Sequence, residues 1–203
     1  MPISAPLKPI TQIEENWAEQ FSATRKKEYQ HSRGYARFAL SELFGVHPFQ
    51  IPLHAEPGKV PELEKGWGYI SISHCSNASL IGWAPRKLGI DLERANRSFN
   101  QNLILNRFFC EKEKDFLKMQ DKNNLRKNVL SRWVLKEAAI KWQRGHLFQD
   151  LVEWESSKDY DWAKHRSLNY KVNTQLINYK SWIIAVAYDK KIHSKTPILC
   201  IEK

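Results

Sequence analysis

Two carboxylates alternate with apolar residues in the segment Gly89-Ile90-Asp91-Leu92-Glu93. In a strand, residues two apart lie on the same face, so Asp91 and Glu93 would point to one side and Ile90 and Leu92 to the other. Two carboxylates held together suit a hard cation such as Mg2+, which binds proteins through one or two carboxylates and keeps water or substrate phosphate as further ligands. An isolated pair of this kind is also typical of a solvated strand face, so it does not establish a site by itself.

A third carboxylate lies in the segment 133–141, which reads as a helix. Glu137 and Lys141 stand four residues apart and share a helix face, as an ordinary surface ion pair would. Trp133 continues the same stripe, however, and apolar residues flank it, which indicates a partly buried carboxylate and ammonium. Such groups can bind metal and phosphate.

Small polar residues follow a β-like run at Ser73-His74-Cys75-Ser76-Asn77. Their hydroxyl, imidazole and backbone N–H groups could receive a phosphate. No third group is spaced so as to make Ser73 and His74 a nucleophile and its base. A polar turn between two strands explains the segment equally well.

The chain carries a net charge of +10, and most of the excess lies in its second half. Residues 1–88 contain 10 Lys and Arg against 8 Asp and Glu, whereas residues 89–203 contain 22 against 14. This imbalance favours an anionic partner, which could be a nucleic acid, a phosphate-rich small molecule or an acidic protein. Arg33, together with Arg25-Lys26-Lys27 and Arg37, could bind phosphate oxygens because guanidinium groups do so bidentately.

A basic nucleic-acid-binding module is the main alternative from another class, since aromatic residues make up 12% of the chain and could stack on bases. They are scattered at core-like positions and no nucleic-acid-binding motif is found, so we expect no nucleic-acid partner. The three cysteines lack metal-ligand spacing. No apolar run of about 18 residues and no signal-peptide pattern occurs, which predicts a cytoplasmic protein without a membrane partner.

The elements that must position these residues follow from the apolar periodicity. We predict a helix over residues 22–43 that stops at Gly45, a long irregular connection over 47–68, and short strands over 68–73, 78–83 and 88–93 that pair as an antiparallel set. Two helical pieces over 99–119 and a helix over 124–142 follow, and then strands over 168–177 and 182–188, with a possible edge strand over 198–201. This order predicts α+β architecture in two comparable halves, joined near residue 88.

Four motifs in sequence resemble the 4′-phosphopantetheinyl transferases of the surfactin and enterobactin synthetase type. The motifs are Ser73-His74, Gly89-Ile90-Asp91-Leu92-Glu93, Arg107-Phe108-Phe109-x-x-x-Glu113 and Trp133-x-x-Lys136-Glu137-Ala138-x-x-Lys141. Two departures are Gly58-Lys59-Val60, where the family often has Gly-Lys-Pro, and Cys110, where Ser or Thr is usual after Phe-Phe. The first leaves Lys59 without an assigned role.

The resemblance implies two similar α/β lobes with pseudo-twofold symmetry, an N-terminal lobe over residues 1–88 and a C-terminal lobe over 89–203, with the active site in the cleft between them. It also implies a Mg2+-dependent enzyme, a holo-[acyl-carrier-protein] synthase. With two lobes in one chain, a monomer is the simplest expectation. Such an enzyme moves 4′-phosphopantetheine from coenzyme A to a serine of an apo acyl, peptidyl or polyketide carrier protein and releases 3′,5′-ADP. Fatty acid, polyketide and nonribosomal peptide synthesis all use such carriers. A degenerate homologue that acts only as a partner protein is the other alternative.

The resemblance also assigns roles to single residues. Asp91, Glu93 and Glu137 would bind the metal, and Glu137 could in addition act as the catalytic base. Lys136 and Lys141 would approach the diphosphate of coenzyme A and the transferred phosphoryl group. The remaining contacts with coenzyme A would come from Ser73 and His74 at its phosphates and from Arg33 at its nucleotide end.

Overall fold

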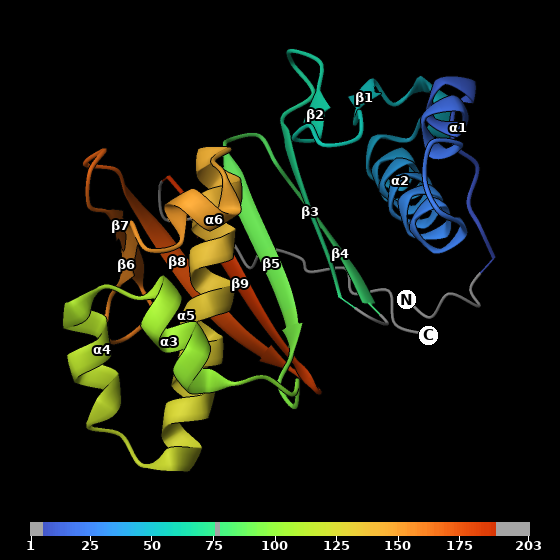
Figure 1. Ribbon diagram of the computed structural model, residues 1–203. Coiled ribbons are helices and arrows are strands. Elements are labelled where there is room, and N and C mark those ends of the chain that lie inside the picture. Colours follow the sequence, from blue (N-terminus) through green and yellow to red (C-terminus); the bar gives the residue numbers. More distant parts are fainter. Residues whose placement is uncertain (1–5, 76–77, 190–203) are drawn as a thin grey trace. The chain divides into compact units, whose positions relative to one another are not determined.

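The structure is a computed structural model that describes residues 6–75 and 78–189 of the 203 (Figure 1). The chain divides into two compact units, of which the first ends at Arg86 and the second begins at Lys87. Both contain helices and strands, so the α+β class expected from the sequence is confirmed. None of the described helices is both long and apolar enough to cross a membrane.

The first unit is built around one long helix. Helix α1 (Gln12–Ala18) begins at Thr11, whose side chain and that of Glu14 cap each other's backbone N–H groups. Helix α2 (Ala23–Phe44) ends at Gly45 with φ of 67°, the left-handed conformation in which glycine avoids a Cβ clash. The predicted helix and its stop are therefore confirmed.

The strands of the first unit form two small antiparallel sheets. The 3-10 turn η1 (Pro48–Gln50) leads to β1 (Leu53–His54), which pairs with β2 (Glu62–Leu63). Strands β3 (Tyr69–Cys75) and β4 (Ala78–Ala84) form the second sheet. A core of small and branched residues joins α2 to these strands: Ala36, Leu40, Ile51, Leu53, Ala55 and Ile70.

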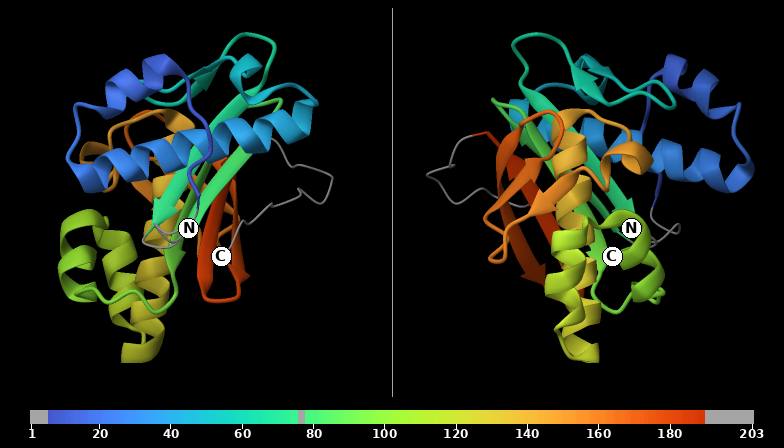
Figure 2. Two further views of the ribbon diagram at one scale, coloured as in Figure 1. Left: turned by 90° about the vertical axis from the view of Figure 1, so that its right-hand side faces the viewer. Right: turned by 60° about the vertical axis from the view of Figure 1, so that its left-hand side comes forward.

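The second unit is a five-stranded antiparallel sheet covered by a helix. Its strands are β5 (Leu88–Arg94), β6 (Trp154–Ser156), β7 (Trp162–His165), β8 (Lys171–Tyr179) and β9 (Trp182–Tyr188), in the order β5-β9-β8-β7-β6. Between β5 and β6 lie α3 (Gln101–Phe108), α4 (Glu111–Lys118), α5 (Lys122–Gln143) and α6 (Leu147–Asp150). Helix α5 runs along one face of the sheet, and α3 and α4 flank it (Figure 2).

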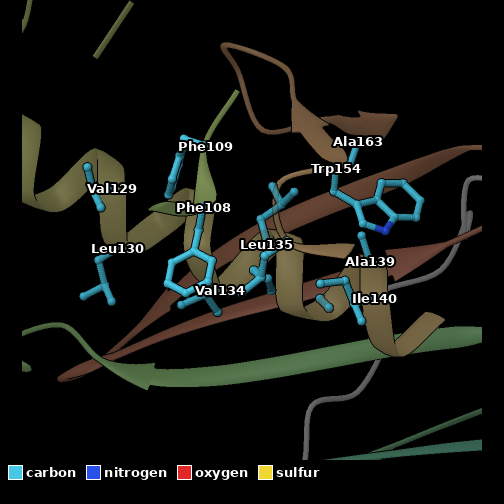
Figure 3. Close-up of a cluster of buried hydrophobic side chains, with 14 of the residues drawn as sticks. Phe108, Phe109, Val129, Leu130, Val134, Leu135, Ala139, Ile140, Trp154 and Ala163 are labelled. Atoms are coloured by element: carbon cyan, nitrogen blue, oxygen red, sulfur yellow. The ribbon is translucent and has the colours of Figure 1, made fainter. Parts of the chain in front are cut away.

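Helix α5 is buried on most of its sides, which explains why it anchors the second unit. Its residues Val134, Leu135, Ala138 and Ala139 are all fully buried. Figure 3 shows the side chains of α5 gathered with those of Phe108, Phe109 and Trp154 in one apolar cluster. Burying this much apolar surface outweighs the low intrinsic helix preference of Trp, Val and Ile residues in α5.

The expected antiparallel set of three strands is wrong in one respect. Strands β3 and β4 pair as expected, but β5 pairs with β9, placing Asp91 opposite Ala185. The turn at residues 85–87 is the point where the chain passes from one unit to the other, so strands adjacent in sequence have different partners. The short elements α1, α6, β6 and β7 were not predicted, and the stretch 47–68, expected to be irregular, contains η1, β1 and β2. The expected edge strand over 198–201 lies outside the described residues.

Candidate functional site

Strand β5 presents its acidic residues to helix α5. Asp91 is buried, with 3% of its surface exposed, and its Oδ1 accepts a hydrogen bond from Nζ of Lys141 at 2.7 Å. The strand alternation places Gly89 and Glu93 on the same side as Asp91, as the sequence predicts. One face of β5 and one face of α5 thus bring an acid–base pair together across fifty residues of sequence.

Glu137 joins this group from the preceding turn of α5. Burial, together with the negative charges of Asp91 and Glu93, raises the pKa of Glu137 to about 8, although the charge of Lys141 opposes the shift. A side-chain hydrogen bond with Asp91 acts in the same direction, because it favours the protonated form of Glu137. The structure therefore brings together Asp91, Glu93, Glu137 and Lys141, four of the residues singled out in the sequence.

Two of the three carboxylates form ion pairs with basic side chains. Lys141 binds Asp91, and Arg97 binds the carboxylate of Glu93, whose pKa is raised by burial and lowered by that arginine. In this arrangement, no three His, Cys, Asp or Glu side chains of residues 6–75 and 78–189 are placed to hold a metal ion.

The donor set nevertheless fits a divalent cation in its chemistry. Three carboxylates provide the oxygen ligands that Mg2+ prefers, and the negative charges of Asp91 and Glu93 act on Glu137 in addition to its burial, so the three ionised carboxylates would repel one another. A bound cation would relieve this repulsion. Asp91, Glu93 and Glu137 would hold it, with Glu93 turning away from Arg97.

Lys136 lies in the core rather than beside the acids. It is fully buried, and its ammonium donates to Oε2 of Glu113 at 2.6 Å and to the carbonyl oxygens of Phe108 and Leu151, each at 3.2 Å. Burial lowers the pKa of Lys136, and the charge of Glu113 opposes that effect. All three N–H groups have internal acceptors, so in this conformation the ammonium is not accessible to a phosphate.

Glu113, the partner of Lys136, belongs to one of the four motifs, but the sequence assigns it no role. Oε1 of Glu113 accepts from the backbone N–H and the hydroxyl of Ser156 at 3.2 and 3.3 Å. Arg132, one turn before Lys136, donates to the carbonyl oxygens of Ser156 and Ser157 at 3.2 and 2.9 Å. This buried network ties α4 and β6 to α5 and thereby fixes which face of the helix presents Glu137.

Ser73 and His74 point to opposite faces of β3. Ser73 is 3% exposed and lies opposite Leu80 in β4, whereas His74 is exposed and lies opposite Ser79. Successive strand residues alternate between faces, so the two side chains cannot both reach one ligand from the same side of the sheet. Of the pair, only His74 presents its side chain to solvent.

Arg33 and Arg37, grouped as one basic face from the sequence, differ in the structure. Arg33 is partly exposed and stacks on the ring of Tyr29, with Cζ 4.8 Å from its centroid, and Nε donates to the carbonyl of Ala55 at 3.2 Å. Arg37 is buried and binds Glu14 with two hydrogen bonds of 2.8 and 3.2 Å. Arg33 is thus the one of the two that a ligand could reach.

Comparison with known proteins adds an independent finding about the second unit. Residues 87–187, just under half of the chain, match the family model of the 4′-phosphopantetheinyl transferase superfamily. A crystal structure of holo-ACP-synthase from Plasmodium yoelii is similar at 16% identity and a TM-score of 0.37, over 52% of this chain and 95% of that one. No curated protein matches the chain. The stretch that holds Asp91, Glu93, Glu137 and Lys141 therefore lies inside the segment that matches the model of this superfamily.

Proposed function

We propose that this protein transfers 4′-phosphopantetheine from coenzyme A to a serine of an apo carrier protein in a Mg2+-dependent reaction that releases 3′,5′-ADP. The observation that carries the proposal is the convergence of three acids and Lys141 between β5 and α5, inside the segment that matches the superfamily. The four motifs favour the surfactin and enterobactin synthetase type. A cytoplasmic monomer stays a prediction.

In the proposed reaction, the serine hydroxyl of the carrier attacks the β-phosphorus of coenzyme A. A phosphorus–oxygen bond to the serine forms, and the bond to the departing 3′,5′-ADP breaks. Glu137 would accept the hydroxyl proton, directly or through a water molecule, once its carboxyl group is deprotonated. Lys141 would move from Asp91 to the phosphate oxygens, where its charge offsets the negative charge that develops there.

When bound, Mg2+ would supply positive charge at the diphosphate and align it for attack. Asp91 and Glu93 would be ligands of the metal, and they lie on β5, which the sheet holds in place. Arg33 is proposed to bind the nucleotide end of coenzyme A and His74 one of its phosphates; a role for Ser73 would require its hydroxyl to become accessible.

The carrier is the acidic partner that the charge distribution favours. Residues 89–203 carry most of the positive excess, which would attract an acidic carrier helix and speed its encounter with the enzyme. Acyl, peptidyl and polyketide carriers all meet this description, so the test must include one of each.

A direct test incubates the purified chain with coenzyme A, Mg2+ and a panel of apo carriers and follows the mass of each carrier. We expect one carrier at least to gain the mass of a phosphopantetheine group, and the gain to stop when EDTA removes the metal. Coenzyme A binding without mass gain would favour the inactive homologue instead. Salt-sensitive oligonucleotide binding without mass gain would favour the nucleic-acid-binding alternative.

A further inference from the structure

Gly89 lies at the closest approach between β5 and α5. A Cβ atom placed on Gly89 would stand 2.0 Å from the carbonyl oxygen of Ala138, and 2.3 and 2.9 Å from the backbone N and Cα of Trp142. Real Cβ atoms do not approach backbone atoms this closely, and backbone cannot turn aside as a flexible side chain can. Any side chain at position 89 must therefore push the strand and the helix apart.

Backbone conformation does not explain the glycine. Among the described glycines, a positive φ occurs at Gly45, Gly58, Gly66 and Gly68, and Gly89 is not one of them. Its neighbours are small as well: Ala138 on α5 and Ala187, opposite Gly89 in β9, are both fully buried. We conclude that a glycine is needed at position 89 because β5 and α5 pack closely there, and that the backbone conformation does not require it.

This close approach lies two residues from the acids. Asp91 follows Gly89 on the same face of β5, and Glu137 precedes Ala138 on α5. The distance between strand and helix at Gly89 therefore determines how near Asp91 and Glu93 come to Glu137 and Lys141.

We propose that Gly89 is a positioning residue, whose missing side chain lets β5 approach α5 closely enough for the acids of the strand and the helix to share one cation. The inference rests on the proposed function, because it concerns the same site. Gly89 touches neither metal nor substrate in this scheme and acts through the spacing of the two elements.

The test measures binding of Mn2+ alone, by electron paramagnetic resonance of the free ion, without coenzyme A or carrier. Gly89→Ala should bind Mn2+ at least about tenfold more weakly than wild type, as expected when the support of metal ligands is displaced. The matched control is Val172→Ala, which removes atoms from the same apolar core at β8, away from β5. It should leave Mn2+ affinity unchanged although it lowers stability.

A compensating variant separates positioning from general damage. Asp91→Glu adds one methylene group. With Gly89 in place, β5 and α5 lie close together, and the longer side chain should weaken Mn2+ binding. In the Gly89→Ala background the longer side chain should regain part of the lost affinity, because it reaches across the widened gap. Such a reversal of sign is not expected if Gly89→Ala only loosens the core.

Several outcomes would overturn the inference. These are wild-type affinity in Gly89→Ala, an equal loss in Val172→Ala, or no Mn2+ binding in wild type. If circular dichroism shows that Gly89→Ala does not fold, Ala138→Val adds volume at the helix residue whose carbonyl oxygen faces Gly89, and wild-type affinity in that variant would equally refute the inference. Wild-type protein that binds Mn2+ but modifies no carrier would overturn the proposed function alone.

Discussion

Lys141 and Asp91 join helix α5 to strand β5 through a single ion pair of 2.7 Å. The lysine compensates part of the negative charge that raises the pKa of Glu137. It is also one-third exposed at its side chain, whereas Asp91 is nearly inaccessible. A metal ion bound by Asp91, Glu93 and Glu137 would compete with Lys141 for Asp91. The ammonium of Lys141 would then be released toward solvent and ligand. In the proposed reaction, the pair would thus couple metal binding to the position of Lys141.

The first prediction concerns the acids themselves. Asp91→Ala and Glu137→Ala should each lower kcat for carrier modification by at least about 100-fold, since each removes a proposed ligand of the metal whose charge would stabilise the reacting phosphate. Circular dichroism should show both variants folded. Glu111→Ala is the control, because that carboxylate is exposed on α4 and forms a surface ion pair with Lys114. Full activity in either site variant would refute the metal assignment.

The second prediction is a pH dependence of the metal-free protein. The pKa of Glu137 is raised from 4.5 to about 8, so between these values the folded state holds a proton that the unfolded state has lost. Stability should therefore fall as pH rises from about 5 to 8. Urea unfolding in EDTA measures the slope, which Glu137→Gln should flatten. Added Mg2+ should also reduce it, because the metal favours the charged carboxylates; a slope unchanged by both would contradict the pKa shift.

The third prediction separates Lys136 from the site. Lys136→Met should cost about 3–5 kcal/mol of unfolding free energy, because it leaves Glu113 buried without its cation. Replacing both residues, as in Lys136→Met with Glu113→Leu, should cost less than the sum of the two single changes. The ion pair of Lys112 with Glu155, in which the lysine is exposed, is the control, and Lys112→Met should change stability little.

The same variants show whether Lys136 stabilises the fold or binds coenzyme A. If Lys136 acts only through the fold, the folded fraction of Lys136→Met should keep the KM for coenzyme A of wild type. A large rise in KM without loss of stability would restore the role at the diphosphate that the motif implies.

Much of the secondary structure was predictable because its signals are local. The periodicity of α2 and the glycine that follows it fixed that helix, and the β-branched runs of β8 and β9 identified both strands. Strand pairing was not predictable in the same way. β5 pairs with β9, some ninety residues later in the chain, and neither segment contains a local signal that identifies its pairing partner.

The site could be predicted only in part, because α5 is buried on most sides. In a helix with one solvated face, periodicity tells which charged residue points inward, but here Lys136 and Glu137 are adjacent and both are largely enclosed. The motif singled out both residues, and only the packing assigns Lys136 to Glu113 and Glu137 to Asp91. The close contact at Gly89 left no signal besides a glycine in a strand.

The last prediction contrasts the two arginines of α2. Arg33→Ala should mainly raise the KM for coenzyme A with a smaller change in kcat, because the proposed contact at the nucleotide end lies away from the reacting phosphate. Arg37→Ala should instead destabilise the protein by about 3–5 kcal/mol, since it leaves the buried carboxylate of Glu14 without its cation. Steady-state kinetics and urea unfolding of both variants make the comparison. If both substitutions raise KM equally and leave stability unchanged, Arg33 and Arg37 both bind coenzyme A, and the structural role given to Arg37 is wrong.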